Sequence, residues 1–363
     1  MKKNKNYVDL KDQPVPEGQH LLEVDDLKMY FHTEDGVVRA VDGVSYTLDR
    51  GETLGVVGES GSGKSVTAMT IMGLISMPPG KIEGGDVRYR GRSILEMTEE
   101  EMQHIRGNDI AMIFQDPMTS LNPVYKIGKQ VGEGLRLHRG YSKQEALKRA
   151  TELLDLVGIP EPEKRVNEYP HQFSGGMRQR VMIAMALACD PDILIADEPT
   201  TALDVTIQAQ IIELMQEMQE KNGNAIIMIT HDLGVVADMA DKIMVMYAGR
   251  PVEFGTAEEI FYESRHPYTW GLIRSIPEQA IDEKKPLTPI HGNPPSLMNL
   301  PEGCVFSPRC PYATDKCRKQ RPERVVTESG HYSACHYSGD PEFLKNAPET
   351  SRTRKYSKKG GEA

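Results

Sequence analysis

A glycine-rich stretch at residues 58–65, directly after a short apolar run, constrains this chain more than any other feature. The stretch is Gly-Glu-Ser-Gly-Ser-Gly-Lys-Ser, and the run before it is Leu54-Gly55-Val56-Val57. A buried strand followed by GxxxxGKS and the start of a helix is the pattern of a phosphate-binding P-loop. The sequence therefore predicts a nucleoside triphosphate site in an α/β fold.

The residue types of this stretch each suit a role in binding phosphates. The glycines let consecutive backbone N–H groups point inward, and the start of the following helix adds partial positive charge. Lys64 is expected to reach the β- and γ-phosphates, and the Ser65 hydroxyl to hold Mg²⁺. A glycine-rich turn that binds nothing is the alternative, but the complete motif in this setting favours ATP or GTP. The predicted nucleotide-binding residues are Gly58, Glu59, Ser60, Gly61, Ser62, Gly63, Lys64 and Ser65.

Length and composition narrow the class of protein. The 363 residues suffice for one large domain with an appendage, or for two domains. The net charge of −10 argues against a general nucleic-acid-binding protein, so no nucleic-acid partner is expected. No stretch approaches the ~20 apolar residues of a membrane span, and the basic residues 1–5 precede no apolar segment of a signal peptide. We therefore expect a cytosolic protein that meets membranes only through partners.

Short apolar runs predict strands that are buried on both faces of a parallel sheet. Helical patterns separate them, as where Ile207, Ile211, Leu214 and Met218 share one helix face, so a doubly wound α/β core is expected. The alternating pattern over residues 21–50 predicts short antiparallel strands, and Gly84-Gly85 with Gly91 predicts a hairpin. The apolar runs lie at residues 110–114, 193–196, 225–229 and 243–246.

A change of composition marks a boundary near residue 275. Eight prolines occur between positions 277 and 311, and four of the five cysteines lie beyond residue 303. The predicted parts are a flexible lead at 1–20, a nucleotide-binding domain at 21–275, a small extension with four cysteines at 276–340, and a disordered, basic tail at 341–363.

Polar residues at strand ends are the candidate catalytic groups. Asp197 and Glu198 follow the run at 193–196. Asp197 is expected to hold Mg²⁺ through water, and Glu198 to polarise the attacking water as a general base. Gln115 and His231 each follow a buried strand and are expected at the same crevice, with Gln115 sensing Mg²⁺ or water and His231 contacting the γ-phosphate. The alternatives are a helix cap for the acidic pair and plain surface positions for the other two.

A second glycine-rich stretch opens an apolar helix after Phe173. Ser174 is a good N-cap, and Gly175 and Gly176 leave backbone N–H groups available. Because the P-loop already surrounds one nucleotide, this second phosphate site is best used on a nucleotide held by another chain. The arrangement resembles the ATP-binding cassette (ABC) ATPases, whose signature helix completes the ATP site of a partner in a head-to-tail dimer.

The resemblance implies further parts of the fold and site. The fold would be a P-loop NTPase core with an antiparallel β subdomain, a helical subdomain at about residues 116–190 and the small C-terminal extension. Gln115 would be the Q-loop, His231 the switch histidine, and residues 201–204 the D-loop with Asp204. The Mg²⁺ ligands would be Ser65, Gln115 and Asp197. An aromatic residue is expected to stack on adenine; alignment places it at Phe31, with Tyr30 as the alternative and plain sheet packing as the other interpretation of either.

Two departures from the family pattern occur. Met177 stands where the signature usually has Gln, and Thr201 where the D-loop usually has Ser. Neither removes Ser174 or the two glycines, so the phosphate contact is expected to persist.

Three stretches look like the oligopeptide/dipeptide importer branch of this family. They are residues 113–123, the signature with Met177, and the segment Arg265-His266-Pro267-Tyr268-Thr269. The resemblance spans about residues 21–340 and implies an ATP-hydrolysing subunit that energises peptide import at the cytoplasmic face of the cell membrane. Its implied partners are a second, non-identical ATPase, two membrane-spanning permease subunits and an extracytoplasmic binding protein. Residues 116–135 would touch a permease.

Alternatives to this function stay open at the level of sequence. Related ATPases serve importers of nickel, haem or oligosaccharide. A different class of alternative is a soluble cassette ATPase that acts on nucleic acid or ribosomes.

The cysteines of the extension predict a metal centre. Cys304, Cys310, Cys317 and Cys335 have the spacing C-x5-C-x6-C-x17-C. A reducing cytosol disfavours disulfides, and structural zinc usually shows tighter pairs, so a [4Fe–4S] cluster is the favoured prediction. Zinc, with His331 or His336 as added ligands, and plain free thiols are the alternatives.

Overall fold

The computed structural model describes residues 10–11, 13–116, 120–200, 205–276 and 289–348. Within these residues the chain forms two compact units. The first unit holds the described residues up to Glu23, then Thr47–Glu52 and Arg88–Ile227; the second holds Val24–Tyr46, Thr53–Val87 and the chain from Met228 onward.

The first unit contains part of a parallel sheet. Strand β6 (Ile110–Ile113) pairs in parallel with β7 (Ile193–Asp197), and β7 neighbours β8 (Ala225–Thr230), whose first three residues belong to this unit. Every residue of the three strands is buried. The predicted apolar runs are thus confirmed as buried strands, because continuous apolar sequence suits a strand covered on both faces.

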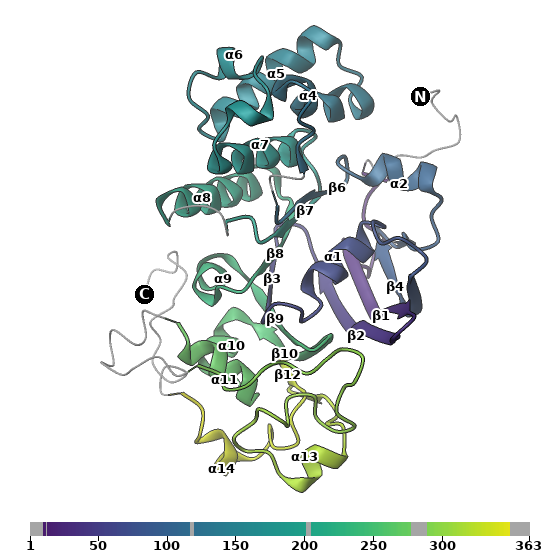
Figure 1. Ribbon diagram of the computed structural model, residues 1–363, viewed down its shortest axis with the longest axis vertical. Coiled ribbons are helices and arrows are strands. Elements are labelled where there is room, and N and C mark those ends of the chain that lie inside the picture. The colour runs from purple at the N-terminus through teal and green to yellow at the C-terminus, as the bar shows by residue number, and fades with distance from the viewer. Residues whose placement is uncertain (1–9, 12, 117–119, 201–204, 277–288, 349–363) are drawn as a thin grey trace. The chain divides into compact units, whose positions relative to one another are not determined.

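Helices α4 to α7 of the first unit lie together (teal in Figure 1). The longer of these helices pack through apolar side chains, as where α5 buries Ala146, Ala150, Leu153 and Leu154. A capping box between Ser142 and Glu145 begins α5. The helices of this unit are α2 (Glu99–Ile105), α4 (Ile127–His138), α5 (Lys143–Leu156), α6 (Pro162–Arg165), the 3₁₀ turn η1 (Pro170–Gln172), α7 (Gly175–Leu187) and α8 (Val205–Asn222).

The second unit contains sheet strands in the order β11-β12-β10-β9-β3-β8, where only Met228–Thr230 of β8 belong to this unit. Strand β3 (Thr53–Val57) pairs in parallel with β9 (Lys242–Tyr247), and β9 pairs antiparallel with β10 (Arg250–Thr256). All five residues of β3 are buried, so the P-loop follows a fixed strand. The outer strands are β12 (Tyr332–Ser333) and β11 (Val325–Val326).

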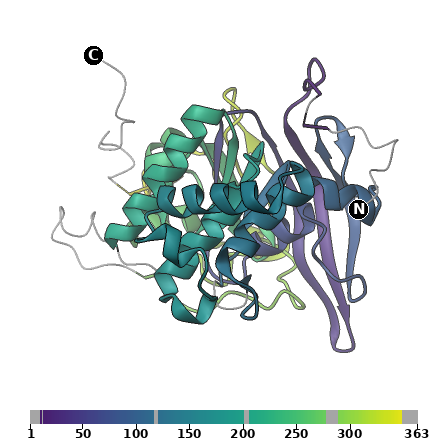
Figure 2. The ribbon, with the colours of Figure 1, turned by 90° about the horizontal axis from the view of Figure 1, so that it is seen from above.

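The four-stranded sheet has the order β2-β1-β4-β5 and belongs mostly to the second unit. Figure 2 shows its long hairpin of β1 (Leu22–Thr33) and β2 (Gly36–Leu48) in purple. The prediction of short strands is wrong here, since the two strands have 12 and 13 residues. The predicted hairpin through Gly84-Gly85 and Gly91 is present as β4 (Gly80–Tyr89) and β5 (Arg92–Ser93), which pair antiparallel. Its turn uses Gly91, while Gly84 and Gly85 lie inside β4.

The rest of the second unit contains short helices and packed aromatic rings. Phe343 of α14 lies against Trp270 of α11, with ring centroids 5.3 Å apart. The predicted disordered tail is therefore wrong for residues 341–344, which this packing orders; residues 349–363 lie outside the described part. The helices are α1 (Lys64–Ile71), α9 (Leu233–Met239), α10 (Ala257–Tyr262), α11 (Pro267–Arg274), α13 (Asp315–Lys319) and α14 (Pro341–Leu344).

The predicted flexible lead at residues 1–20 differs from the structure where it is described. Leu10 is buried, and the Lys11 ammonium donates to the carbonyl oxygens of Asn108 and Cys189 at 3.2 and 3.1 Å, within the first unit. One apolar side chain and one cation thus anchor this stretch. Among the described residues, no helix has the length and apolar character needed to cross a membrane.

Candidate nucleotide site

The P-loop of the second unit has the shape that a phosphate site needs. It connects β3 to α1, whose N-cap is Gly63. Gly58 has φ +152°, and a Cβ there would lie 2.2 Å from the backbone oxygen of Met246, so only glycine fits. The Ser62 Oγ atom is buried and has no hydrogen-bond partner among the described residues. A backbone arch with an unpaired buried hydroxyl at a helix N-terminus fits a phosphate group.

Lys64 supplies the positive charge of this loop. Its ammonium donates to the backbone oxygens of Gly58 at 2.7 Å and Glu59 at 3.0 Å, and the residue is buried. The side chain therefore already spans the loop. No acidic residue lies in the first turn of α1, so nothing there opposes an anion.

In the first unit, Glu198 and Gln115 form a pair. The Gln115 amide donates to a carboxylate oxygen of Glu198 at 3.0 Å. Glu198 follows β7 with φ 47°, a left-handed conformation that costs a non-glycine residue free energy. Asp197, the last residue of β7, is buried, while Gln115 is exposed. The structure thus brings the Q-loop glutamine into contact with the candidate base, while their catalytic roles stay predictions.

The proposed Mg²⁺ ligands have suitable chemistry. Ser65 lies in the first turn of α1, in the second unit; Gln115 and Asp197 lie in the first. Hydroxyl, amide and carboxylate oxygens are the ligand types that Mg²⁺ prefers. These residues thus fit the ion in kind.

His231 follows β8 in the second unit and is exposed. The next residue, Asp232, caps α9 by accepting from the N–H of Gly234 at 2.8 Å. This cap fixes the backbone beside the imidazole. In the sheet of this unit, β8 is a neighbour of β3, which carries the P-loop.

The signature residues form the N-terminus of α7 in the first unit. Ser174 is the N-cap, and its hydroxyl accepts from the N–H of Met177 at 3.3 Å. Ser174 and Gly175 are exposed, and a Cβ at Gly175 would meet nothing within 4 Å. The start of this helix at Ser174 and Gly175 therefore faces open space, as a site for another chain's nucleotide would, while Gly176 is half-buried. Asp204 and Thr201 of the D-loop lie outside the described residues.

Phe31 and Tyr30 are the two candidates for stacking on adenine, and their side-chain contacts differ. The Tyr30 hydroxyl donates to Asp42 at 3.0 Å, and Asp42 also accepts from Arg250 at 2.8 Å. Tyr30 is thus engaged in a side-chain network. Phe31, on the β1 face that also carries Met29, is half-buried and remains our prediction for the stacking residue.

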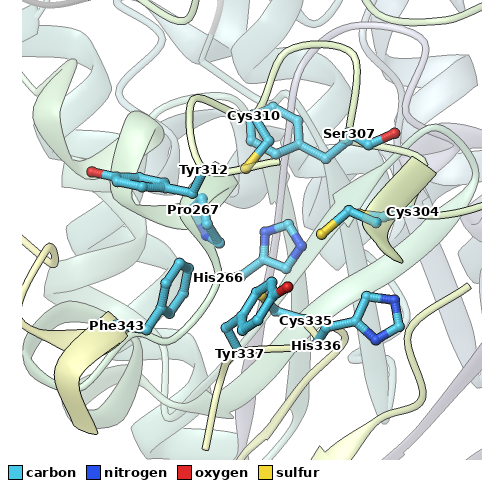
Figure 3. Close-up of a pocket in the computed structure, with 12 residues that line it drawn as sticks. His266, Pro267, Cys304, Ser307, Cys310, Tyr312, Cys335, His336, Tyr337 and Phe343 are labelled. Carbon is cyan, nitrogen blue, oxygen red and sulfur yellow. The ribbon is translucent and has the colours of Figure 1, made fainter. Parts of the chain in front are cut away.

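The predicted metal centre is wrong. Cys304, Cys310, Cys317 and Cys335 do line one pocket, and Figure 3 shows three of them beside aromatic rings. In the described part of the chain, however, no three His, Cys, Asp or Glu side chains form a group that could hold a metal ion. Neither the [4Fe–4S] cluster nor zinc is therefore supported.

The surroundings of the cysteines suit neutral thiols. Burial raises the pKa of Cys310 to about 11 and that of Cys335 to about 12, which favours the thiol over the thiolate that binds metals. The two histidines are engaged elsewhere: His331 pairs with Glu253 at 3.0 Å, and His336 with the backbone oxygen of Gln320 at 2.9 Å. The cysteines are free thiols of an apolar, aromatic pocket.

Two residues that touch the P-loop were not predicted from the sequence. The Glu59 N–H donates to the Tyr268 hydroxyl at 2.9 Å, and the Glu59 carboxylate accepts from Arg309 at 2.5 and 2.9 Å. They lie 209 and 250 residues away in sequence. Only the segment Arg265–Thr269 gave a signal, and it indicated a family rather than a contact.

Comparison with known proteins places this geometry in a family. A family model described as ABC transporter matches residues 41–201. A second, described as the C-terminal region of oligopeptide/dipeptide transporters, matches residues 252–317. The P-loop and the signature helix with its exposed start thus belong to an ATP-binding cassette.

Relatives narrow the branch. The chain is 58% identical to the oligopeptide transport ATP-binding protein OppD of Bacillus subtilis, over 86% of this chain and 87% of that one. It is 52% identical to the dipeptide transport ATP-binding protein DppD of Escherichia coli, over 88% and 97%. The chain therefore belongs to the ABC transporter ATP-binding proteins, in their oligopeptide/dipeptide branch, and the resemblance predicted from its motifs is confirmed.

A solved structure supports the fold. The dimeric, post-hydrolysis structure of the ATP-binding cassette MJ0796 bound to ADP and phosphate is similar, with TM-score 0.60 and 29% identity over 65% of this chain and 98% of that one. The predicted α/β cassette fold with its antiparallel sheet and helical part is confirmed.

Proposed function

We propose that this chain is the ATP-hydrolysing subunit that energises import of dipeptides and oligopeptides by an ABC importer. The observation that carries the proposal is the pair of matches: a cassette with an intact P-loop, and a C-terminal region of the oligopeptide/dipeptide kind. Relatives that are 58% and 52% identical to it over the aligned residues are described as oligopeptide and dipeptide transport ATP-binding proteins.

The P-loop holds ATP, and Glu198 activates water. Backbone N–H groups of residues 58–63 and the Lys64 ammonium bind the phosphates. Ser65, Gln115 and Asp197 would hold Mg²⁺, which would supply positive charge against the phosphates. Glu198 accepts a proton from the attacking water, and its bond to Gln115 orients the carboxylate. The products are ADP and phosphate.

The exposed start of the signature helix gives the chain a second role. Ser174 and Gly175 face open space at the start of α7, where they cap a nucleotide bound by a second, non-identical ATPase. That partner caps the nucleotide of this chain in return. The dimer described for MJ0796 with ADP and phosphate supports such an arrangement.

The remaining partners are two permeases and an extracytoplasmic binding protein, with this chain at the cytoplasmic face. Within the segment 116–135, the described side chains of Val124 and Tyr125 are 71% and 44% exposed. Apolar side chains left in water suit a docking surface for a permease.

The assembled transporter in vesicles tests the proposal. We expect peptides, and neither nickel, haem nor oligosaccharide, to stimulate ATP hydrolysis. Glu198→Gln should keep MgATP binding but lower hydrolysis by about 10²–10⁴-fold, since the amide cannot accept the proton. Glu213→Gln, an exposed acid of α8, is the matched control. Stimulation by another solute would overturn the cargo, and normal turnover of Glu198→Gln would overturn the base.

A further inference from the structure

Glu59, the second residue of the P-loop, points its carboxylate at the C-terminal region rather than leaving it unpaired. Both carboxylate oxygens accept from the Arg309 guanidinium, Oε2 from Nη1 at 2.5 Å and Oε1 from Nη2 at 2.9 Å. A bidentate pair of this kind fixes orientation as well as charge. All residues of this contact belong to the second unit.

Contacts other than the one with Glu59 also hold the Arg309 side chain. Its Nε donates to the backbone oxygen of His291 at 3.0 Å, and Nη2 to that of Ile290 at 3.1 Å. Its side chain is only 4% exposed, and the guanidinium lies 5.7 Å from the ring centroid of Tyr247. The cation therefore stands ready in a site built by the C-terminal region and β9, and loses little entropy on pairing.

Tyr268 makes a second contact with the same P-loop residue. Its hydroxyl accepts from the Glu59 N–H at 2.9 Å. The ring is fully buried and packs on Tyr247 and Phe306, with centroids 4.6 and 5.3 Å away. The backbone at the start of the P-loop is thus tied to an aromatic cluster that cannot shift freely.

These contacts matter because Glu59 brings negative charge to a loop that receives a triphosphate. Like charges in a partly buried site repel more strongly than in water. Arg309 neutralises that charge and turns it away. We propose that Arg309 and Tyr268 are positioning residues, through which the C-terminal region holds the P-loop in its ATP-receptive form and offsets the charge of Glu59. The proposal rests on the P-loop as the nucleotide site.

The MgATP affinity of single and double variants of Arg309 and Glu59 tests whether Arg309 offsets the charge of Glu59. We expect Arg309→Ala to raise the Kd of the full-length protein for MgATP about tenfold, because Glu59 is left unpaired. Arg309→Lys should be intermediate, since a lysine cannot bind bidentately. Adding Glu59→Gln to Arg309→Ala should restore affinity to within about threefold of wild type. Arg318→Ala, which removes an exposed arginine paired with Asp315 in the same region, is the control.

Loss of folding would not produce this pattern, because the second substitution of the pair could not repair it. The proposal is overturned if Arg309→Ala binds MgATP as wild type does, or if the double variant binds no better than Arg309→Ala alone. The Lys64→Ala variant tests separately whether the P-loop binds the nucleotide. Unchanged MgATP affinity in that variant would overturn the P-loop as the nucleotide site.

Hydrogen exchange of the nucleotide-free protein tests Tyr268. Tyr268→Phe removes one hydroxyl and keeps the ring, so we expect faster exchange of the Glu59 amide with an unchanged melting temperature to within a few degrees. A matched Tyr312→Phe variant, whose ring packs on Trp270 and Phe343, should leave that amide protected. Equal protection of Glu59 in wild type and Tyr268→Phe would overturn this contact.

Discussion

At the scale of single residues, the burial of His266 makes the stability of the protein depend on pH. It is the N-cap of α11, where its Nδ1 accepts from the Tyr268 N–H at 3.1 Å, and it is fully buried. Burial lowers the pKa of His266 to about 3 from 6.5. The folded protein therefore keeps this imidazole neutral at a pH where the unfolded chain binds a proton.

This difference predicts a loss of stability in acid. Between pH about 6.5 and about 3 only the unfolded state is protonated at His266, so the free energy of unfolding falls by up to about 1.4 kcal/mol per pH unit as pH drops. His266→Asn keeps a capping acceptor but cannot titrate. We expect its melting temperature to fall less than that of wild type between pH 7.5 and 5, measured by calorimetry.

The exposed His171 provides the control, since His171→Asn should keep the wild-type pH dependence. An equal decline in wild type and His266→Asn would contradict the assignment. The prediction concerns the slope with pH, because removing a buried ring also lowers stability at every pH through lost packing.

At the scale of elements, the sequence predicted well where one local pattern decided the structure. Runs of four or five apolar residues became β6, β7, β8 and β9 because buried parallel strands require them. The glycines at 84–85 lie inside β4 and not in the turn of its hairpin, since glycine in a strand marks a close approach as often as a turn.

The candidate site was likewise predictable only where residues close in sequence determine its geometry. The P-loop and the Ser174 cap were predictable because their geometry is local. The environment of the four cysteines was not, because spacing along the chain does not report which rings surround a thiol or whether it is desolvated. Likewise, nothing near Glu59 in sequence signals Arg309, which arrives from 250 residues away.

Gly85 in strand β4 has a backbone conformation and a close neighbour that only glycine tolerates. It has φ +85°, and a Cβ there would lie 2.5 Å from the backbone oxygens of Asp25 and Asp26 on β1. Gly84→Ala is the matched control, because its nearest atom, the Lys28 Cδ, is 3.7 Å away. We expect Gly85→Ala to lower the free energy of unfolding by about 1–3 kcal/mol, and Gly84→Ala by less than about 0.5 kcal/mol, both by urea titration. Equal losses in the two variants would contradict the backbone strain assigned to Gly85.

At the scale of the whole molecule, the two units carry different parts of the ATPase. The P-loop, His231 and the residues that hold Glu59 belong to the second unit; Gln115, Glu198 and the signature belong to the first. Within the first unit, the Gln179 amide donates to the backbone oxygen of Pro199 at 2.7 Å, one residue after Glu198. This hydrogen bond therefore links the signature helix to the residue that follows the candidate base.

That linkage makes the signature a test of the proposed dimer. Ser174→Arg places a bulky cation at the exposed start of α7, where the partner's nucleotide would bind. In the assembled transporter we expect ATP hydrolysis to fall at least about tenfold, while photolabelling of this chain by an azido-ATP analogue stays within twofold of wild type. Ser142→Arg, at the N-cap of α5, loses an equivalent cap and should keep hydrolysis. Full hydrolysis in Ser174→Arg, or loss of labelling, would mean that this helix does not serve the partner's site.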